Sequence, residues 1–369
     1  MYKIFRIILT HGCFIIIFFS SFLFSQNNSN NFEKAERIIK KILNKQKVPG
    51  LAITVSKNQN IVWSQGFGYS DLENKVPVDP KKTLFRVGSI SKPITAVALM
   101  KTIEEGLISL DSSIYCYVPY FPIKKHDISI EQLGAHLSGI RNYKGNEFLS
   151  NESLSIKEGV SIFKNDSLIF KPGSDFAYTS YNWNLISLAI QEQAKMSFED
   201  YVKTRVILPF KMKSTFADEN EVLPYKAIFY GKAGRKNFKP QPEVNNYSKL
   251  GSGGYLSTSE DINRLGRVML NDTLVNPEQL KSFITAQKTD DGISTYYGIG
   301  FEVSYDHKGR PYYGHVGNGL GGYGIFYVYP KQNIVLSILV NCSNPNIDRL
   351  FNKLIDAVFE SLQSIPPYT

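Results

Sequence analysis

The sequence predicts a mixed α/β fold in which strands from both chain ends form one antiparallel sheet and a mostly helical region is inserted between them. Three observations support this prediction. A helix and two short apolar runs lie near the amino terminus, four strand-like segments and a helix lie near the carboxyl terminus, and the middle shows helical or loop-like patterns. Each group of strands is too small to bury its own faces, so the simplest solution is one shared sheet, covered by the first and last helices.

The terminal elements are indicated by their apolar spacing. Apolar residues recur at helical spacing over 32–43, and a final helix has its apolar face between Ile347 and Leu362. The turn-rich KNQN separates two apolar runs, which predicts a β-hairpin. The expected strands are 51–56, 61–68, 297–305, 312–317, 323–330 and 333–341.

The middle of the chain contains the predicted helices 90–106, 130–136, 181–195, 198–207 and 259–271. We therefore expect an α/β region at about 32–88 and 272–369 and a helical region at about 89–271, with a cleft along their border. Ligand sites tend to form at such borders.

The first 25 residues are typical of a secretory signal peptide or of a retained membrane anchor. Lys3 and Arg6 precede an apolar run over 7–24. Cleavage is expected near Ser25, although large side chains occupy places where small ones are usual, which leaves the anchor open. Both interpretations place 26–369 outside the cytoplasm, in the periplasm or the extracellular space.

Composition excludes several classes of protein. Hydrophobic residues make up 43% and charged residues 20%, which excludes a disordered chain or a coiled coil. The net charge of +9 becomes 40 − 33 = +7 without Lys3 and Arg6, which favours association with anionic envelope or membrane surfaces. No motif indicates nucleic-acid binding. Three cysteines are too few for a disulfide framework, and a bridge in the mature chain could join only Cys116 to Cys342.

A candidate nucleophile stands before the predicted helix 90–106. Ser89 and Lys92 are three residues apart, so on a helix their side chains share a face. Serine needs a nearby base, and a lysine kept neutral by burial or by cations can supply one. The pattern alone is weak, because Ser161 and Lys164 repeat it, and a surface or capping role remains open for either pair.

Two further sequence motifs strengthen the interpretation of Ser89 as a nucleophile. Tyr178 and Ser180 come directly before the predicted helix 181–195, and a tyrosine near cations can have a lowered pKa and transfer protons. His315 and Gly317 lie on a predicted strand, where a glycine admits close approach of a substrate. Tyr255 with Ser257, and His307 with Gly309, repeat these spacings. The histidines show no metal-ligand spacing.

These three elements, in this order, resemble the serine β-lactamase and penicillin-binding protein superfamily. The variant S-x-x-K, Y-x-S and H-x-G is most similar to class C β-lactamase-like hydrolases, among them the mitochondrial serine β-lactamase-like proteins and their bacterial relatives. The segments VPGLAITVS, LGAHLSGIRNY and GSGGYLSTSEDINRL agree with it. The resemblance covers roughly residues 33–360 and implies the β-lactamase/DD-peptidase fold.

The resemblance implies a hydrolase that forms an acyl-enzyme and needs no metal or organic cofactor. Ser89 would be the acylated nucleophile, with Lys92 and Tyr178 sharing general-base and proton-transfer work. Ser180 and His315 would orient the substrate or help to protonate the leaving group. The backbone N–H groups of Ser89 and Asn318, next to Gly317, would form the oxyanion hole.

Departures from the family pattern bear on the substrate. Ser180 stands where many relatives have an amide side chain, and His315 and Val316 replace the lysine and threonine that help to hold a β-lactam carboxylate. Esterase or peptidase action on a small molecule or a peptide is therefore expected over efficient β-lactam hydrolysis. The alternatives are a catalytically idle binding or scaffold protein for cell-wall peptides, and a true β-lactamase or D,D-carboxypeptidase. The oligomeric state is not indicated.

Overall fold

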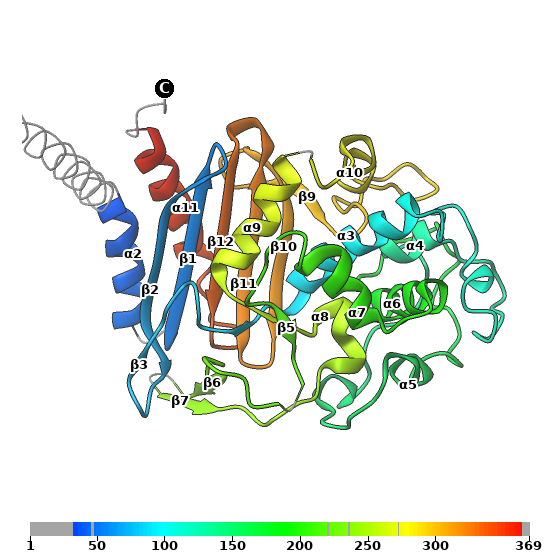
Figure 1. Ribbon diagram of the computed structural model, residues 1–369, viewed down its shortest axis with the longest axis horizontal. Coiled ribbons are helices and arrows are strands. Elements are labelled where there is room, and N and C mark those ends of the chain that lie inside the picture. Colours follow the sequence, from blue (N-terminus) through cyan, green and yellow to red (C-terminus); the bar gives the residue numbers. More distant parts are fainter. Residues whose placement is uncertain (1–31, 46–47, 220, 235–236, 272, 364–369) are drawn as a thin grey trace, which may run out of the picture. The chain divides into compact units, whose positions relative to one another are not determined.

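The largest element of the computed structural model, which describes residues 32–45, 48–219, 221–234, 237–271 and 273–363, is a seven-stranded sheet (Figure 1). Its strand order is β3-β2-β1-β12-β11-β10-β9, and every neighbouring pair is antiparallel. The predicted α/β class, with one sheet made by both chain ends, is confirmed. The strands are β1 Gly50–Lys57, β2 Asn60–Asp71, β3 Val76–Pro77, β9 Glu302–Tyr305, β10 Pro311–Gly319, β11 Gly322–Tyr329 and β12 Ile334–Val340.

The two chain ends meet where β1 pairs with β12, from Leu51 opposite Val340 to Lys57 opposite Ile334. All seven residues of β12 are buried, as is nearly all of β1, which explains why both segments are almost continuously apolar. The predicted hairpin joins β1 to β2. Asn58 and Gln59 form its turn at φ angles of 50° and 69°, as a two-residue hairpin loop requires.

The strand predicted over 297–305 is wrong in its first half, because β9 begins only at Glu302. Before it, the N–H of Gly298 donates to the carbonyl of Phe301, and Gly300 has a φ of +83°. A Cβ at Gly300 would lie 2.8 Å from the ring of Trp183. The chain therefore turns here against a buried aromatic side chain, which the alternation of side chains did not reveal.

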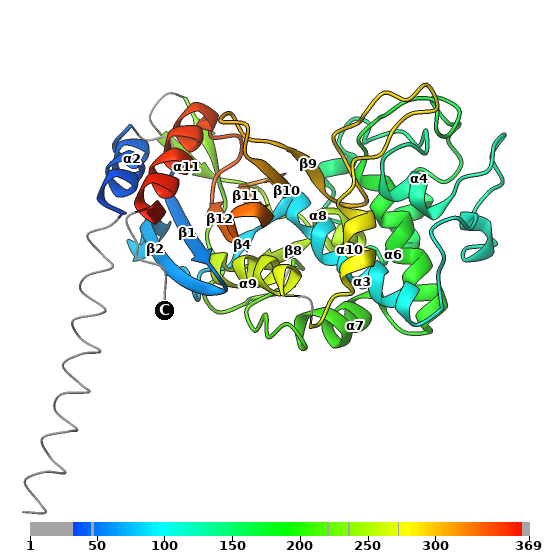
Figure 2. The ribbon, with the colours of Figure 1, turned by 90° about the horizontal axis from the view of Figure 1, so that it is seen from above.

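One face of the sheet is covered by α9 (Ser259–Leu270), which contacts β1, β11 and β12 (Figure 2). The helix lies close because Gly266 faces the sheet: a Cβ there would come within 2.6 Å of Val335 and 2.9 Å of Phe326. The side-chain amide of Asn263 donates to a backbone carbonyl on each of two strands, at Thr54 and Val335. These bonds fix the helix on the sheet.

The middle of the chain contains α3 and α6, which pack against each other and are buried on nearly all sides. The predicted helices are found there, although α7 passes into a π-helical turn at Lys203–Ile207. Three short helices were not predicted, because four to seven residues show no clear period. The helices are α3 Ser91–Glu104, α4 Ile130–Gly134, α5 Ile156–Ser161, α6 Ser180–Ala194, α7 Phe198–Val202, α8 Leu250–Gly253 and α10 Pro277–Phe283.

Two small sheets are also present. Their strands, apart from β4 at the end of the expected α/β region, lie in the part of the chain that was expected to be mostly helical or loop-like. Strands of two to four residues are too short for alternation to be visible. The pairing of β4 with β8 fixes the segment just before Ser89. These strands are β4 Phe85–Arg86, β5 Phe216–Ala217, β6 Tyr230–Ala233, β7 Asn237–Pro240 and β8 Tyr255–Ser257. The proposed boundaries between an α/β and a helical region stay a prediction.

The helices near the chain ends, α2 (Glu33–Asn44) and α11 (Asp348–Gln363), pack against each other and form a compact unit. Their apolar faces are those expected from the sequence, and Lys34 pairs with Glu360 between them. That these helices cover the sheet stays a prediction.

Cys116 is exposed and Cys342 is buried, and both are free thiols. The expected signal peptide or anchor lies outside the described residues. None of the helices in the described part of the chain combines the length and the apolar character that crossing a membrane requires.

Candidate active site

Ser89 lies in a short 3-10 turn, Gly88–Ile90, directly before α3. Gly88 has a φ of +53°, and a Cβ there would lie 2.8 Å from the backbone nitrogen of Asn318 on β10. The turn therefore needs glycine both for its conformation and for its close approach to the strand. As a result, the partly exposed Ser89 lies beside the backbone of β10.

The Ser89 hydroxyl contacts both of the side chains expected beside it. Lys92 Nζ lies 3.0 Å from Ser89 Oγ, and Tyr178 Oη donates to the same oxygen at 2.7 Å. Lys92 is fully buried and also donates to the carbonyl of Ser252 at 2.7 Å. Its Nζ lies 4.8 Å from the centre of the Tyr178 ring. The amine of Lys92, one helical turn away, and the phenol of Tyr178, distant in sequence, thus both contact the hydroxyl oxygen of Ser89.

Burial acts in opposite directions on the two possible bases. It lowers the pKa of Lys92 from 10.5 to about 7, although the nearby carboxylate of Glu302 raises it. Burial also raises the pKa of Tyr178 above its ordinary value, against the effect of the bond to Ser89. The expected lowering of the Tyr178 pKa is therefore wrong, because desolvation raises the pKa by more than the hydrogen bond with Ser89 lowers it. At neutral pH the amine is the stronger candidate base.

His315 lies on β10 and is only 2% exposed. Its Nδ1 is 2.7 Å from the carbonyl of Val316, which can only accept, so Nδ1 carries the proton. Nε2 then accepts from the hydroxyl of Tyr297 at 2.9 Å. Burial and the charge of Lys92 lower the pKa of His315 to about 3, so the imidazole is neutral. Both ring nitrogens of His315 therefore have hydrogen-bond partners within the protein. A direct contact between His315 and the substrate stays a prediction.

Sequence reasoning missed two partners of His315, Tyr297 and Glu302. Glu302 Oε1 lies 3.4 Å from His315 Nδ1 and accepts from the N–H of Val316 at 3.2 Å. Burial raises the pKa of Glu302 to about 7. Both residues belong to a segment interpreted only as a strand, where a glutamate next to an apolar run gave no separate signal.

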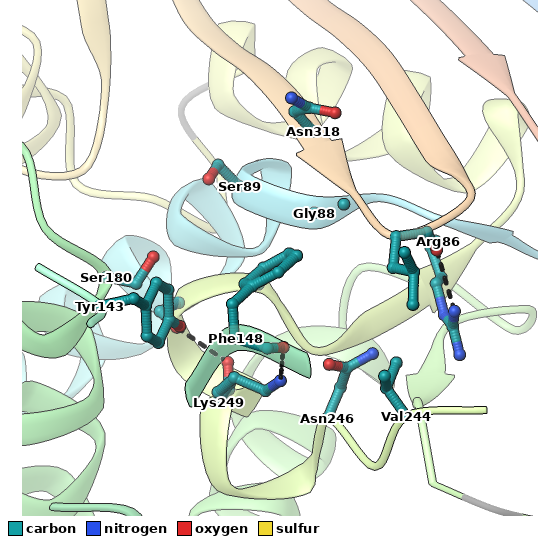
Figure 3. Close-up of a pocket in the computed structure, with 14 residues that line it drawn as sticks. Arg86, Gly88, Ser89, Tyr143, Phe148, Ser180, Val244, Asn246, Lys249 and Asn318 are labelled. Atoms are coloured by element: carbon teal, nitrogen blue, oxygen red, sulfur yellow. Dashed lines mark hydrogen bonds between the residues drawn. The ribbon is translucent and has the colours of Figure 1, made fainter. Parts of the chain in front are cut away.

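A small cavity of about 30 Å³ opens beside Ser89 (Figure 3). Ser180 and Asn318 line it, whereas His315 and Gly317 are not among its lining residues. Gly317 is needed elsewhere: a Cβ there would lie 1.9 Å from the carbonyl oxygen of Val87. Gly317 therefore allows β10 to pack closely against the backbone of Val87. The full lining is Arg86, Gly88, Ser89, Tyr143, Phe148, Ser180, Val244, Asn246, Lys249, Ser252, Gly253, Asn318, Gly319 and Leu320.

Two cations in this lining were not anticipated, since a single basic residue forms no recognisable motif. Arg86 donates to Asp218 at 2.6 Å and to the carbonyl of Leu320 at 2.9 Å. Lys249 is 7% exposed and donates to the carbonyl of Phe148 at 2.9 Å (Figure 3). Burial and the charge of Arg86 lower the pKa of Lys249 to about 8.

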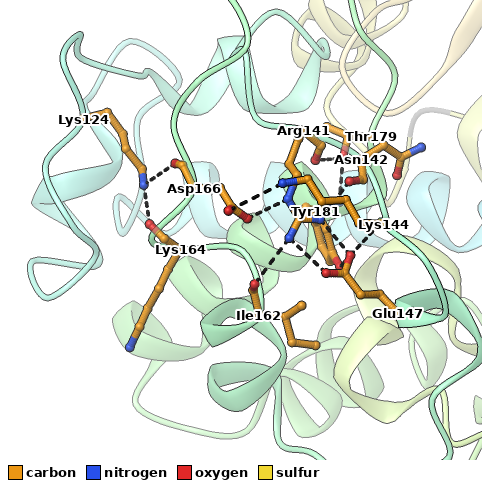
Figure 4. A network of polar contacts seen from close by, with 10 residues as sticks. All are labelled: Lys124, Arg141, Asn142, Lys144, Glu147, Ile162, Lys164, Asp166, Thr179 and Tyr181. Atoms are coloured by element: carbon orange, nitrogen blue, oxygen red, sulfur yellow. Dashed lines mark hydrogen bonds and ion pairs between the residues drawn. The ribbon is translucent and has the colours of Figure 1, made fainter.

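The wall that carries Tyr143 and Phe148 is held by Arg141 and its carboxylate partners. The guanidinium donates to both oxygens of Glu147, at 2.7 and 3.0 Å, and to Asp166 at 2.6 Å. Tyr181 on α6 donates to Glu147 at 2.8 Å (Figure 4). A bidentate pair is geometrically specific, so the network fixes this wall relative to α6.

Within the described residues, no group of three or more His, Cys, Asp or Glu side chains is arranged to hold a metal ion.

Comparison with known proteins gives a family match over most of the chain. A family model described as Beta-lactamase matches residues 35–358. The human mitochondrial serine beta-lactamase-like protein LACTB is 29% identical over 309 residues, which are 64% of this chain and 56% of the relative. Protein flp of Staphylococcus aureus is 27% identical over 343 residues, covering 87% and 65% respectively. The chain thus spans less than two thirds of the length of these curated relatives.

A solved structure agrees with the fold. The octameric penicillin-binding protein homologue from Pyrococcus abyssi is 25% identical and superposes with a TM-score of 0.78 over 88% of this chain and 76% of that one. The predicted resemblance to the serine β-lactamase and penicillin-binding protein superfamily is confirmed.

Proposed function

The chain belongs to the beta-lactamase family, and on that premise we propose that it is a serine hydrolase that forms an acyl-enzyme on Ser89. The observation that carries this proposal is the pair of contacts at Ser89 Oγ, one with the buried amine of Lys92 and one with the phenol of Tyr178. A binding protein needs neither a nucleophile nor a base, so this arrangement favours an enzyme.

In the first step, neutral Lys92 takes the hydroxyl proton of Ser89 while Oγ bonds to the carbonyl carbon of the substrate. The bond from that carbon to the leaving oxygen or nitrogen then breaks. The raised pKa of Tyr178 keeps it a neutral phenol, so it donates its own proton to the leaving group and takes one from Lys92. Water next adds its hydroxyl to the acyl carbon and returns a proton to Ser89 Oγ.

The negative charge that develops on the carbonyl oxygen needs hydrogen-bond donors. We assign this role to the backbone N–H groups of Ser89 and Asn318. The close approach of Gly88 to the Asn318 backbone supports the assignment, because it brings the two segments together beside the cavity.

The remaining predicted residues have supporting roles in this proposal. Ser180 lines the cavity and begins α6, so its hydroxyl is placed to contact the substrate. His315 has a positioning role: it accepts a hydrogen bond from Tyr297, whose ring packs edge-to-face against that of Tyr178. Gly317 lets β10 approach the segment that precedes Ser89.

The bond cleaved is proposed to be an ester, amide or peptide bond of a small molecule or peptide, within a class C-like branch of the family. The third motif has lost its lysine and threonine, which weakens the hold on a β-lactam or D-Ala-D-Ala carboxylate. We therefore expect turnover of a 4-nitrophenyl ester to exceed that of nitrocefin and of a D-Ala-D-Ala peptide. The reverse ranking would favour a β-lactamase or D,D-carboxypeptidase.

A fluorophosphonate probe tests the hydrolase proposal itself. We expect the purified protein to gain one phosphonyl group and the Ser89→Ala variant to gain none. Ser161→Ala is the matched control, because it removes the serine of the other S-x-x-K pattern, whose hydroxyl is exposed and bonded to the carbonyl of Lys157. Absence of labelling in all three proteins would favour the idle binding or scaffold protein.

We also propose that the protein is exported and that it associates with the envelope. The support is the layout of Lys3, Arg6 and the apolar run over 7–24. Fractionation of the native host cells tests this, and recovery of the protein in the cytoplasm would contradict it.

A further inference from the structure

Lys249 lies in the cavity beside Ser89 without an anionic partner of its own. In the described part of the chain its ammonium makes no ion pair, and it donates to the neutral carbonyl of Phe148. Burying an ammonium without a counter-charge is costly. The lowered pKa of Lys249 has the direction expected for a buried cation that lacks such a partner.

The neighbouring charges leave this end of the cavity positive. Arg86 is paired with Asp218, and Lys226 lies 3.2 Å from the same carboxylate. The charge of Asp218 also acts on Lys249, without an ion pair, so three cations lie near one carboxylate. One nitrogen of Arg86, Nη2, is buried and has no hydrogen-bond partner among the described residues. The local excess of positive charge and of free donors suits a carboxylate.

The rest of the lining suits an uncharged chain that leads to such a carboxylate. In the close-up the side chain of Phe148 lies between Ser89 and Lys249, and that of Tyr143 lies to one side, next to Ser180 (Figure 3). Arg141 fixes this wall, so the spacing from the serine to the ammonium is set by the fold. An acyl group would therefore rest on the aromatic wall with its polar end at Lys249.

The position of the proton donor decides which part of the substrate occupies the cavity. The leaving group must be near Tyr178, because the phenol donates its proton to that group in the proposed mechanism. Tyr178 does not line this cavity, whereas Lys249 does. The acyl group that stays on Ser89 is then the part that extends toward Lys249.

We propose that the enzyme is selective for substrates whose acyl group carries a carboxylate, and that Lys249 binds this carboxylate. The inference rests on the proposed hydrolase function and adds a substrate class to it. The family's third motif has an anion-binding lysine where this chain has His315. Lys249 would supply an anion-binding amine instead, on the acyl side of the cavity.

Matched esters test the proposal. The acidic substrate is 4-nitrophenyl hydrogen adipate, and its neutral partner is methyl 4-nitrophenyl adipate, in which a methyl group on the far carboxyl removes the charge. A third ester, 3-carboxy-4-nitrophenyl pentanoate, carries the carboxylate on the leaving group. Rates with Ser89→Ala give the background. We expect the wild type to show a kcat/KM for the acidic adipate roughly 10- to 100-fold above that for the neutral one, the range of a charge-assisted hydrogen bond.

Variants separate charge recognition from a structural role. We expect Lys249→Met to lose this preference, so that the ratio of kcat/KM for the acidic adipate to that for the neutral one falls to about one, and Lys249→Arg to retain it. Lys226→Met is the control, since it removes a cation of the same cluster that does not line the cavity.

Four results would contradict the proposal, and they differ in what they leave standing. Equal loss on both adipates in Lys249→Met would overturn the proposal, because it would show that Lys249 only supports the Phe148 wall. A preference for the leaving-group carboxylate would overturn the acyl-side assignment. Turnover of the neutral ester with no preference in the wild type would overturn this inference and leave the hydrolase function standing. No turnover of any ester, together with no phosphonate labelling, would remove both.

Discussion

The pH dependence of turnover follows from the burial of Lys92. With a pKa of about 7, half of the Lys92 side chains are neutral at pH 7 and roughly one in ten at pH 6. A lysine with the ordinary value of 10.5 would be neutral in only about one molecule in 3,000 at pH 7. Burial therefore increases the amount of active base on the order of a thousandfold at neutral pH.

The perturbation that tests this reasoning is Glu302→Gln. The Glu302 carboxylate raises the pKa of Lys92 and itself titrates at about 7, so the wild-type midpoint belongs to the pair. Glutamine keeps an oxygen that accepts from the N–H of Val316 but removes the charge. The pKa of Lys92 then falls, neutral base persists at lower pH, and the acid limb moves to lower pH.

The assay is kcat/KM on 4-nitrophenyl butyrate from pH 5 to pH 10, corrected with Ser89→Ala. We expect the wild-type rate to rise about tenfold from pH 6 to pH 8 and then level off. A rate that keeps rising above pH 9 would show that Lys92 has an ordinary pKa. A midpoint that moves upward in Glu302→Gln would refute the assigned sign of the coupling.

Three substitutions test other parts of the site. Lys92→Met should raise the free energy of unfolding by about 1–3 kcal/mol at pH 6. Because the folded-state pKa lies below the unfolded one, the gain should shrink as pH rises from about 7 toward 10.5, which urea unfolding would measure. Tyr178→Phe should lower kcat by about 10²- to 10⁴-fold with an unchanged circular dichroism spectrum; a rate near wild type would remove the phenol from proton transfer. Gly317→Ala should cost about 1–3 kcal/mol, since its Cβ meets the Val87 carbonyl, and should abolish phosphonate labelling; full labelling would contradict the close packing of β10.

Parts of the fold were predictable because their cause is local. The β1–β2 hairpin follows from two apolar runs and a turn that adopts positive φ angles at Asn58 and Gln59. The central position of β12 follows from its continuous apolar run. The start of β9 was not predictable, because the turn at Gly300 is fixed by contact with Trp183, more than a hundred residues away.

The site divides in the same way. Ser89 and Lys92 lie one helical turn apart, so their proximity could be predicted from spacing, and Tyr178 followed from a motif in family order. The direction of the Tyr178 pKa shift could not be predicted from the sequence, because it depends on how much protein surrounds the phenol. Lys249 was missed because its meaning comes from burial in a cavity assembled from several separate segments.

The most direct test of the account is the location of a trapped acyl group. A 4-nitrophenyl ester is mixed with the protein, quenched with acid before deacylation, digested and analysed by tandem mass spectrometry. We expect the mass of the acyl group on Ser89 and its accumulation in step with the first turnover. An acyl group on another side chain, or turnover of the ester without any adduct at Ser89 under rapid quenching, would contradict the acyl-enzyme mechanism.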